Sequence, residues 1–114
     1  MERCLLMIVI TISGVFADSI RPDKDTMTSY EGESVTLKCS YDTSSNNVLL
    51  YWYKQNVNTE PQYLLWKKAR SYNRDEDIPD SRFDSITSQT STELIIKSVS
   101  LSDSALYHCA LTVG

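Results

Sequence analysis

The residues of this sequence whose types could carry out chemistry are two cysteines and a histidine. Cys39 and Cys109 lie far apart in the chain, and His108, the single histidine, directly precedes Cys109. A cysteine beside a histidine could form a thiolate nucleophile, and cysteines together with a histidine could bind zinc. Two cysteines in an oxidising compartment would instead form a disulfide. The compartment and the elements that carry these residues decide among the three possibilities.

The N-terminus indicates the compartment. A short start with the basic Arg3 leads into an apolar run over residues 5–12, and small residues precede Asp18. The run is too short to span a bilayer and has the layout of a secretory signal peptide. We therefore expect residues 1–17 to be removed by cleavage after Ala17 and a single domain to cover residues 18–114. Cys4 would leave with the signal peptide.

Cys39 and Cys109 then remain in the secretory pathway, and we expect them to be bonded to each other. A bridge that closes a loop of about 70 residues stabilises the fold by on the order of 4 kcal/mol. A bonded Cys109 has no thiolate, and strand alternation turns His108 to the opposite face. One histidine with two bridged cysteines is also too few ligands for zinc. We therefore expect no enzyme activity, no metal and no cofactor.

The motifs and the net charge of the sequence exclude further classes of binding partner. The sequence contains no glycine-rich phosphate loop, and its formal net charge of -4 provides no basic surface for a phosphate backbone. We expect neither nucleic acid nor a small-molecule substrate as a partner. With 41% hydrophobic and 23% charged residues, the chain has the composition of a packed globular domain.

The elements that must position the two cysteines are β-strands. Residues 34–40 alternate strictly, so that Val35, Leu37 and Cys39 share one face, which we expect to point into the core. Similar short runs, separated by turn residues, occur along the rest of the chain at 50–55, 63–66, 83–87, 93–97 and 105 to about 111. The polar segments 41–47 and 67–73 are predicted to be loops. This spacing favours an all-β sandwich of two sheets.

Four residues combine into a specific signature. In an immunoglobulin sandwich, two cysteines join facing sheets, a tryptophan packs on the bridge, and a tyrosine two residues before the second cysteine closes a corner. Cys39, Trp52, Tyr107 and Cys109 fit these roles by type and spacing. Arg82 and Asp103 resemble the ion pair found at the base of variable domains, a stabilising feature. With Leu37, these residues form the expected core signature.

The sequence resembles a T-cell receptor variable segment of the alpha or delta type, which is an immunoglobulin V-set domain. The resemblance covers essentially all of residues 18–114. It rests on Trp52-Tyr53-Lys54-Gln55, on Pro61-Gln62-Tyr63-Leu64-Leu65, and on residues 103–111, which end in Cys109-Ala110-Leu111. It implies a V-type, two-sheet Greek-key sandwich with one inter-sheet disulfide.

The resemblance also implies a further strand that this sequence does not supply. The chain stops five residues after Cys109, and no Phe-Gly-x-Gly joining motif follows. We expect the last (G) strand to be missing, as in an unrearranged germline segment, and the strand from Ala105 to Leu111 to have an unpaired edge prone to aggregation or domain swapping.

The resemblance implies pairing with a second variable-domain chain as a heterodimer. The residues that we expect at that interface are Tyr53, Gln55, Pro61, Leu65 and His108. It implies ligand contact through loops at one end of the sandwich. The residues that we expect there are Asp42, Thr43, Ser44, Ser45, Asn46, Asn47, Lys67, Lys68, Arg70, Ser71, Tyr72, Ala110 and Leu111. Because Lys67, Lys68 and Arg70 are basic, acidic ligand surfaces are favoured.

The implied function is antigen recognition in adaptive immunity, on the extracellular side of the plasma membrane after passage through the secretory pathway. An alpha-type chain would bind a peptide presented on an MHC molecule, and a delta-type chain other cell-surface ligands. Membrane signalling subunits would be engaged through a constant region that this sequence lacks. A non-rearranging innate immune receptor and a cell-adhesion V-set ectodomain are the alternatives. Both normally encode their last strand, so the missing joining motif favours the rearranging receptor.

Overall fold

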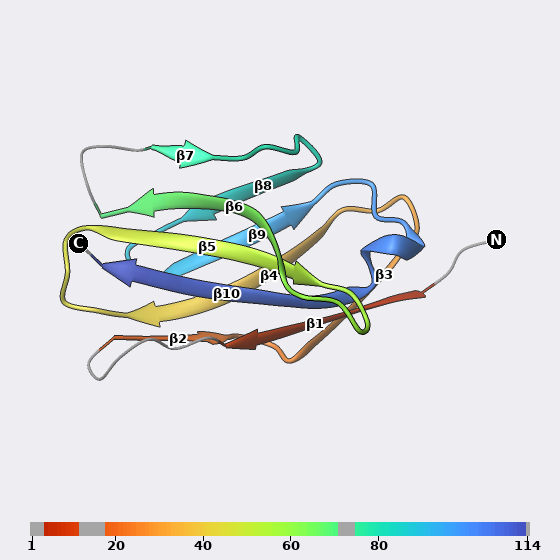
Figure 1. Ribbon diagram of the computed structural model, residues 1–114, viewed down its shortest axis with the longest axis horizontal. Helices are drawn as coiled ribbons and strands as arrows, with labels where there is room; N and C mark the ends of the chain where they lie inside the picture. The colour runs from red at the N-terminus through yellow and green to blue at the C-terminus, as the bar shows by residue number, and fades with distance from the viewer. Residues whose placement is uncertain (1–3, 12–17, 71–74, 114) are drawn as a thin grey trace.

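Two stacked β-sheets make up the protein (Figure 1). The computed structural model describes residues 4–11, 18–70 and 75–113. One sheet has four antiparallel strands in the order β2 (Ser19–Pro22), β4 (Val35–Asp42), β9 (Ser91–Ile96) and β8 (Phe83–Thr87). The other has six strands in the order β3 (Thr26–Tyr30), β1 (Cys4–Thr11), β10 (Ala105–Val113), β5 (Val48–Gln55), β6 (Gln62–Ala69) and β7 (Glu76–Asp77). The predicted all-β sandwich is confirmed.

Strict alternation of apolar and polar residues explains the four-stranded sheet. In β4, Val35, Leu37 and Cys39 are buried while the residues between them are exposed. In β9, Leu94 and Ile96 are buried in the same way. Each strand therefore turns one face to the second sheet and the other to solvent, as expected for a half-buried antiparallel sheet.

Several strands are longer than their sequence pattern indicated. β4 continues to Asp42, β5 already begins at Val48, and β6 continues through Ala69, although residues 41–47 and 67–73 were expected to be loops. The register pairs Leu49 with Lys68, and Leu50 with Lys67. Backbone pairing with β5 therefore extends β6 into a segment with polar side chains. A strand tolerates polar side chains there because one face of this sheet does not pack against the other sheet.

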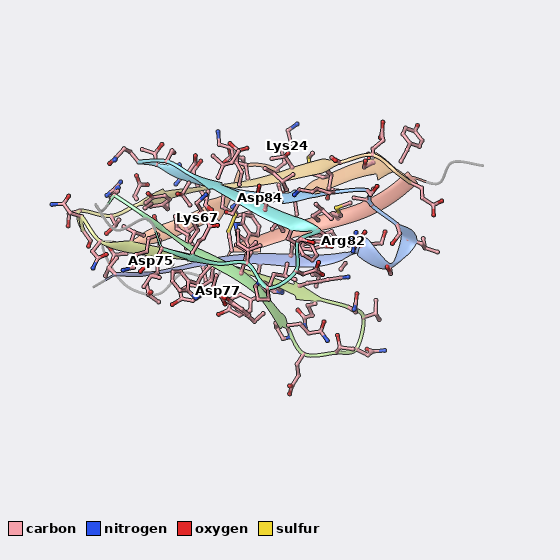
Figure 2. The ribbon with its side chains drawn as sticks, turned by 90° about the horizontal axis from the view of Figure 1, so that it is seen from above. Lys24, Lys67, Asp75, Asp77, Arg82 and Asp84 are labelled. Carbon is pink, nitrogen blue, oxygen red and sulfur yellow. A yellow bond between two sulfur atoms is a disulfide. The ribbon has the colours of Figure 1, made fainter. Side chains whose placement is uncertain are left out.

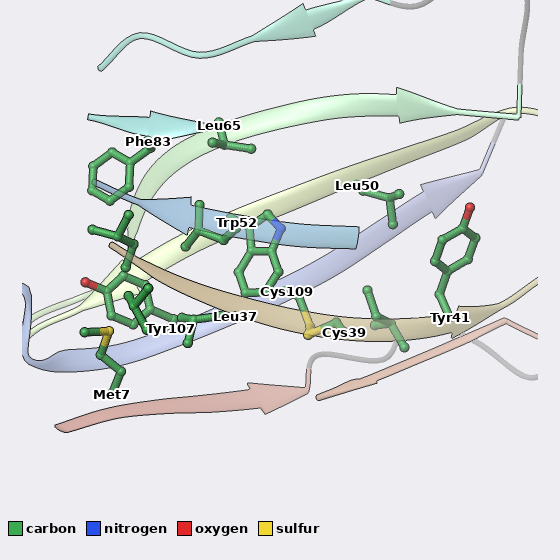
Figure 3. Packing of buried hydrophobic residues seen from close by; sticks show 14 of the residues in the cluster. Met7, Leu37, Cys39, Tyr41, Leu50, Trp52, Leu65, Phe83, Tyr107 and Cys109 are labelled. Carbon is green, nitrogen blue, oxygen red and sulfur yellow. A yellow bond between two sulfur atoms is a disulfide. The ribbon is translucent and has the colours of Figure 1, made fainter. Parts of the chain in front are cut away.

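The core lies between the sheets around the disulfide (Figure 3). Cys39 in β4 and Cys109 in β10 are bonded with an S–S distance of 2.04 Å, and Trp52 lies beside the bridge. Leu37, Trp52 and Tyr107 are fully buried. The predicted bridge between the sheets and the tryptophan against it are confirmed.

Leu65 belongs to this core, and its expected place at the domain interface is wrong. Its side chain is 0% exposed, and it pairs directly with Trp52, so both point inward. The register of β5 and β6 then shifts, so that the next residue, Tyr53, pairs with Tyr63. This β-bulge leaves Leu64 unpaired in the register and re-aims the side chains that follow.

β1 occupies a position that we expected to be vacant. It lies between β10 and β3, parallel to β10 from the pair Met7 and Ala105 to the pair Thr11 and Cys109, and antiparallel to β3. The Met7 side chain is fully buried in the core. In the full chain, β1 therefore pairs with β10 from Ala105 through Cys109. The unpaired edge along Ala105–Leu111 was expected for residues 18–114 alone, and it stays a prediction for that shorter chain. An apolar extended segment can satisfy the backbone groups of both neighbouring strands and cover the adjacent core.

Candidate functional site

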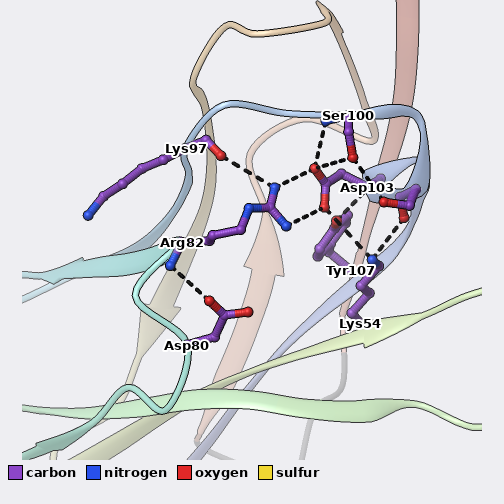
Figure 4. Close-up of polar contacts among 8 residues, drawn as sticks. Lys54, Asp80, Arg82, Lys97, Ser100, Asp103 and Tyr107 are labelled. Atoms are coloured by element: carbon purple, nitrogen blue, oxygen red, sulfur yellow. Dashed lines mark hydrogen bonds and ion pairs between the residues drawn. The ribbon is translucent and has the colours of Figure 1, made fainter.

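The base of the sandwich is fixed by a cluster of polar contacts around Asp103 (Figure 4). The Arg82 Nη2 and Asp103 Oδ2 atoms are 2.6 Å apart, and the Tyr107 hydroxyl donates to the Asp103 carbonyl oxygen at 2.7 Å. The Ser100 backbone N–H donates to the Asp103 carboxylate at 2.8 Å. The expected ion pair and tyrosine corner are both present. These residues hold the start of β10 in place.

The environment of Asp103 keeps its side chain ionised. Burial alone would raise the pKa of this fully buried carboxyl group, but the hydrogen bonds from Arg82 and Ser100 lower it below its ordinary value of 3.8. Lys54 adds a second positive charge, with its Nζ atom 3.9 Å from Asp103 Oδ1. The carboxylate is thus held by hydrogen bonds from two segments of the chain and by the charge of Lys54 from a third.

The outer face of the six-stranded sheet carries three tyrosines, which we call the tyrosine face: Tyr51, Tyr53 and Tyr63. The Tyr51 and Tyr53 rings are stacked with centroids 6.3 Å apart, and the Tyr63 ring meets Tyr53 edge-on at 6.2 Å. The Tyr63 hydroxyl donates to Asp77 Oδ2 at 2.5 Å. Tyr63 remains 42% exposed. Contact among rings and the bond to β7 restrict these side chains, so a partner can pack on them with little loss of side-chain entropy.

Gln55 and His108 lie on the same face and bond to each other. Their Oε1 and Nε2 atoms are 2.9 Å apart, and the Gln55 amide nitrogen donates to the Thr59 carbonyl oxygen at 2.9 Å. The Gln55 oxygen must then accept, so His108 Nε2 carries the proton and Nδ1 is the free acceptor. Within the described residues, His108 Nδ1 is buried without a hydrogen-bond partner. Burial lowers the pKa of His108 below 6.5.

The structure brings together three of the five residues expected at the interface, namely Tyr53, Gln55 and His108. Pro61 is exposed just before β6, and Leu65 is in the core. Tyr51 and Tyr63 belong to the face but were not selected from the sequence. Tyr51 could have been identified, because it alternates in the strand with residues 53 and 55. Tyr63 could not, because its position depends on the bulge between β5 and β6, which the sequence does not reveal.

One end of the sandwich, which we call the loop end, comprises residues 43–47, Arg70, residues 88–90 and the end of β10. It holds residues 43–47 and Arg70 of the set expected to contact a ligand, whereas Lys67 and Lys68 lie within β6, and the turn at residues 88–90 was not part of that set. Cross-strand pairs bring the end of β10 to the start of β5 and the start of β5 to the end of β6. Figure 1 shows the β4–β5 connection and the end of β10 at the same end. Asp42 ends β4, and Ala110 and Leu111 lie within β10. Ser71 and Tyr72 lie outside the described residues.

Two of the three basic residues expected to attract acidic ligands are engaged within the chain. Lys67 donates to the Ser85 carbonyl oxygen at 2.8 Å and pairs with Glu76 at 3.4 Å, on the flank where Asp75 and Asp77 also lie (Figure 2). The Arg70 guanidinium donates to the carbonyl oxygens of Thr43 at 2.6 Å and Gln89 at 2.8 Å. Lys68, half-buried in β6, is the remaining basic residue of the set.

Comparison with known proteins gives the family. Residues 23–114 match the model of the immunoglobulin V-set domain. This chain belongs to the immunoglobulin V-set family. The family is not enzymatic. Among the residues described for this V-set domain, no helix is long and apolar enough to cross a membrane.

The relatives of this V-set domain are T-cell receptor variable segments. It is 37% identical to human T cell receptor alpha variable 18 over 93% of this chain and 92% of the relative. It is 31% identical to the rabbit (Oryctolagus cuniculus) T-cell receptor alpha chain V region RL-5, over 96% and 80%. Human T cell receptor alpha variable 14/delta variable 4 is 38% identical over 71% and 69%. The chain is therefore an antigen-recognition variable domain of the alpha or delta type.

A solved structure supports the fold. A chain from the work titled "Structural basis of T cell specificity and activation by the bacterial superantigen toxic shock syndrome toxin-1" superposes with a TM-score of 0.62. The match covers 99% of this chain and 83% of that chain, at 16% sequence identity. At this identity the likeness shows a shared sandwich.

Proposed function

We propose that this domain pairs with a second variable domain through the tyrosine face and binds its ligand through the loop end. The single observation that supports pairing most directly is the contiguous set of restrained aromatic rings, Tyr51, Tyr53 and Tyr63, on a sheet face that does not cover the core. Aromatic side chains are enriched at protein interfaces and carry much of their binding energy. Gln55 extends the face with a polar group, and the buried His108 supports it through its hydrogen bond.

The ligand proposed for an alpha-type chain is a peptide presented on an MHC molecule, and for a delta-type chain a related cell-surface ligand. Residues 43–47 supply serine and asparagine side chains, which adapt their hydrogen bonds to different ligands. Signalling would require membrane subunits reached through a constant region joined to this domain. We further propose that residues 1–17 direct the chain into the secretory pathway, that the domain acts on the extracellular side of the plasma membrane, and that it has no enzyme activity.

Pairing can be tested by co-expressing the chain with candidate partner variable domains and measuring the dissociation constant. Replacing Tyr53 with alanine should raise that constant about 30-fold, because truncating a central aromatic contact costs roughly 2 kcal/mol. Tyr30→Ala is the matched control, since Tyr30 is 49% exposed on β3, at the edge of the same sheet and separated from β5 by β1 and β10. If Tyr53→Ala and Tyr63→Ala both pair as tightly as the unchanged chain, the proposed interface is wrong.

The charge preference of the loop end has its own test. With Lys67 and Arg70 engaged inside the chain, Lys68 is the residue whose charge a ligand would meet. We expect Lys68→Glu to slow association with an acidic ligand surface and Lys68→Gln to slow it less, because steering depends on charge. Identical association rates for the three forms at low ionic strength would end the proposal of an acidic ligand.

A further inference from the structure

Arg70 connects three segments of the loop end that are distant in sequence. Its guanidinium donates to the carbonyl oxygens of Thr43 at 2.6 Å and Ser45 at 3.1 Å, both in the connection between β4 and β5. It also donates through Nε to the carbonyl oxygen of Gln89, in the turn between β8 and β9, at 2.8 Å. Arg70 itself directly follows β6. One side chain thus bridges two loops from the end of a third element.

The Arg70 guanidinium packs against the ring of Tyr41. The Arg70 guanidinium carbon lies 5.1 Å from the ring centroid, a distance at which a cation is attracted to an aromatic face. The Tyr41 hydroxyl donates to the carbonyl oxygen of Ser88 at 2.5 Å, which fixes the same β8–β9 turn. Tyr41 is 1% exposed, so its ring is a rigid surface on which the guanidinium packs. The guanidinium is therefore held between a buried ring and loop carbonyls.

Arginine is chemically suited to this position. Its planar fork presents five N–H donors in fixed directions, so it can bond several carbonyl oxygens from different segments at once, which a lysine ammonium on a flexible stem does less well. The Arg70 backbone has a φ of 62°, in the left-handed region that favours glycine or asparagine. Residues with a Cβ occupy this region when surrounding contacts hold them there, often at functional sites.

We propose that Arg70 is a positioning residue, which orders the β4–β5 loop and the β8–β9 turn relative to the end of β6 before any ligand arrives. Loops that are already ordered lose less entropy on binding, so a preorganised end binds more tightly than a mobile one. This assignment replaces the expectation that Arg70 itself contacts the ligand. Its functional meaning rests on the proposed function, whereas the coupled order of the two loops does not.

Amide hydrogen exchange of the full chain tests the proposal without a ligand. The reporters are Ser45, Asn47 and Ser88, whose amide N–H groups bond within the two loops. We expect Arg70→Ala to speed exchange about tenfold in both loops, since charged hydrogen bonds that close a local opening are lost. Arg70→Lys should give a smaller acceleration, because it keeps the charge and part of the stacking on Tyr41.

Arg21→Ala is the matched control. Arg21 lies near the end of β4 and pairs with Asp42 at 3.4 Å, but both side chains of that pair are more than 60% exposed, at 64% and 71%. Losing this charge should leave both loops at the rates of the unchanged chain. The proposal is overturned if either loop keeps its rate in Arg70→Ala, or if amides in β5 and β9 accelerate as much as the loops, because that would be global destabilisation. Failure to find a ligand would overturn the proposed function and leave this result intact.

Discussion

Asp103 has contacts on several sides, and Arg82 makes the closest of them. Replacing Arg82 with alanine leaves a fully buried carboxylate with the Ser100 N–H and the more distant Lys54 ammonium. We expect the free energy of unfolding to fall by about 2 kcal/mol, the usual cost of leaving a buried charged acceptor partly unsatisfied. Arg82→Lys should lose less. Urea unfolding of the three forms measures the difference, and equal midpoints would show that solvent replaces the arginine.

His108 provides a pH dependence with a definite sign. Burial lowers its pKa in the folded chain below the ordinary 6.5, so the unfolded chain binds the proton more readily. Stability should therefore be complete above pH 6.5 and fall as the pH drops below that value, until the folded-state pKa is passed. His108→Gln keeps a hydrogen-bonding group beside Gln55 but cannot titrate there.

Urea unfolding between pH 7.5 and pH 5 tests this effect, because His108 is the single histidine of the chain. The slope of stability against pH should be positive in the unchanged chain and close to flat in His108→Gln, apart from any contribution of the N-terminal amine. Equal slopes in the two forms would assign the pH dependence to other groups.

Residue identities were predictable where spacing alone defines the role. The bridge, Trp52 and Tyr107 follow from type and separation, the Arg82–Asp103 pair follows from the resemblance to variable domains, and the structure confirms them. Leu65 and Tyr63 were not predictable in this way, because their facing depends on a bulge that changes the register of β6 by one residue. The engagement of Arg70 also escaped the sequence, since its partners are backbone carbonyls contributed by other loops.

Among the elements, the turn between β3 and β4 depends on one glycine. Gly32 has a φ of 89°, and its N–H donates to the Val99 carbonyl oxygen at 2.8 Å. A Cβ on Gly32 would meet no atom within 4 Å, so the cost of a substitution is conformational. We expect Gly32→Ala to lower the free energy of unfolding by about 1 kcal/mol, and Gly32→Asn by less, because asparagine tolerates positive φ.

Urea midpoints of the Gly32 variants measure that cost. Gly32→Asn is the informative control, since it adds more atoms than alanine but in a residue type suited to the conformation. If asparagine destabilises the chain more than alanine does, crowding rather than backbone strain governs this turn.

Strand existence was predictable from alternation, as in β4 and β9. The ends of β5 and β6 were not, because pairing with a neighbour extends a strand beyond its apolar pattern.

At the scale of the whole molecule, the position between β3 and β10 holds one strand. The sequence predicted that the sandwich would have a strand too few beside β10, and the structure fills that place with β1. Residues 4–11 lie within the predicted signal peptide, residues 1–17, and apolar β-branched residues serve either as a signal core or as a strand. Composition alone could not separate the two uses of this segment.

If residues 1–17 are cleaved, as we propose, β3 and β10 each lose a partner and the core loses the buried Met7 side chain. We expect a chain of residues 18–114 to unfold at lower urea concentration than the full chain, because burying a methionine contributes roughly 1.5–3 kcal/mol. We also expect it to form concentration-dependent dimers through the free strand edges. Sedimentation velocity at several concentrations measures the association.

A chain lacking only residues 1–3 is the matched control, since it retains all of β1. Extending residues 18–114 by a further C-terminal strand should restore the monomer, because that strand would return along β10 and satisfy the same backbone groups in the antiparallel direction. The two strands cannot occupy the position together, so the extended chain should gain nothing from retaining residues 4–11. A monomeric 18–114 chain as stable as the full chain would show instead that the edges of β3 and β10 are closed without any added strand.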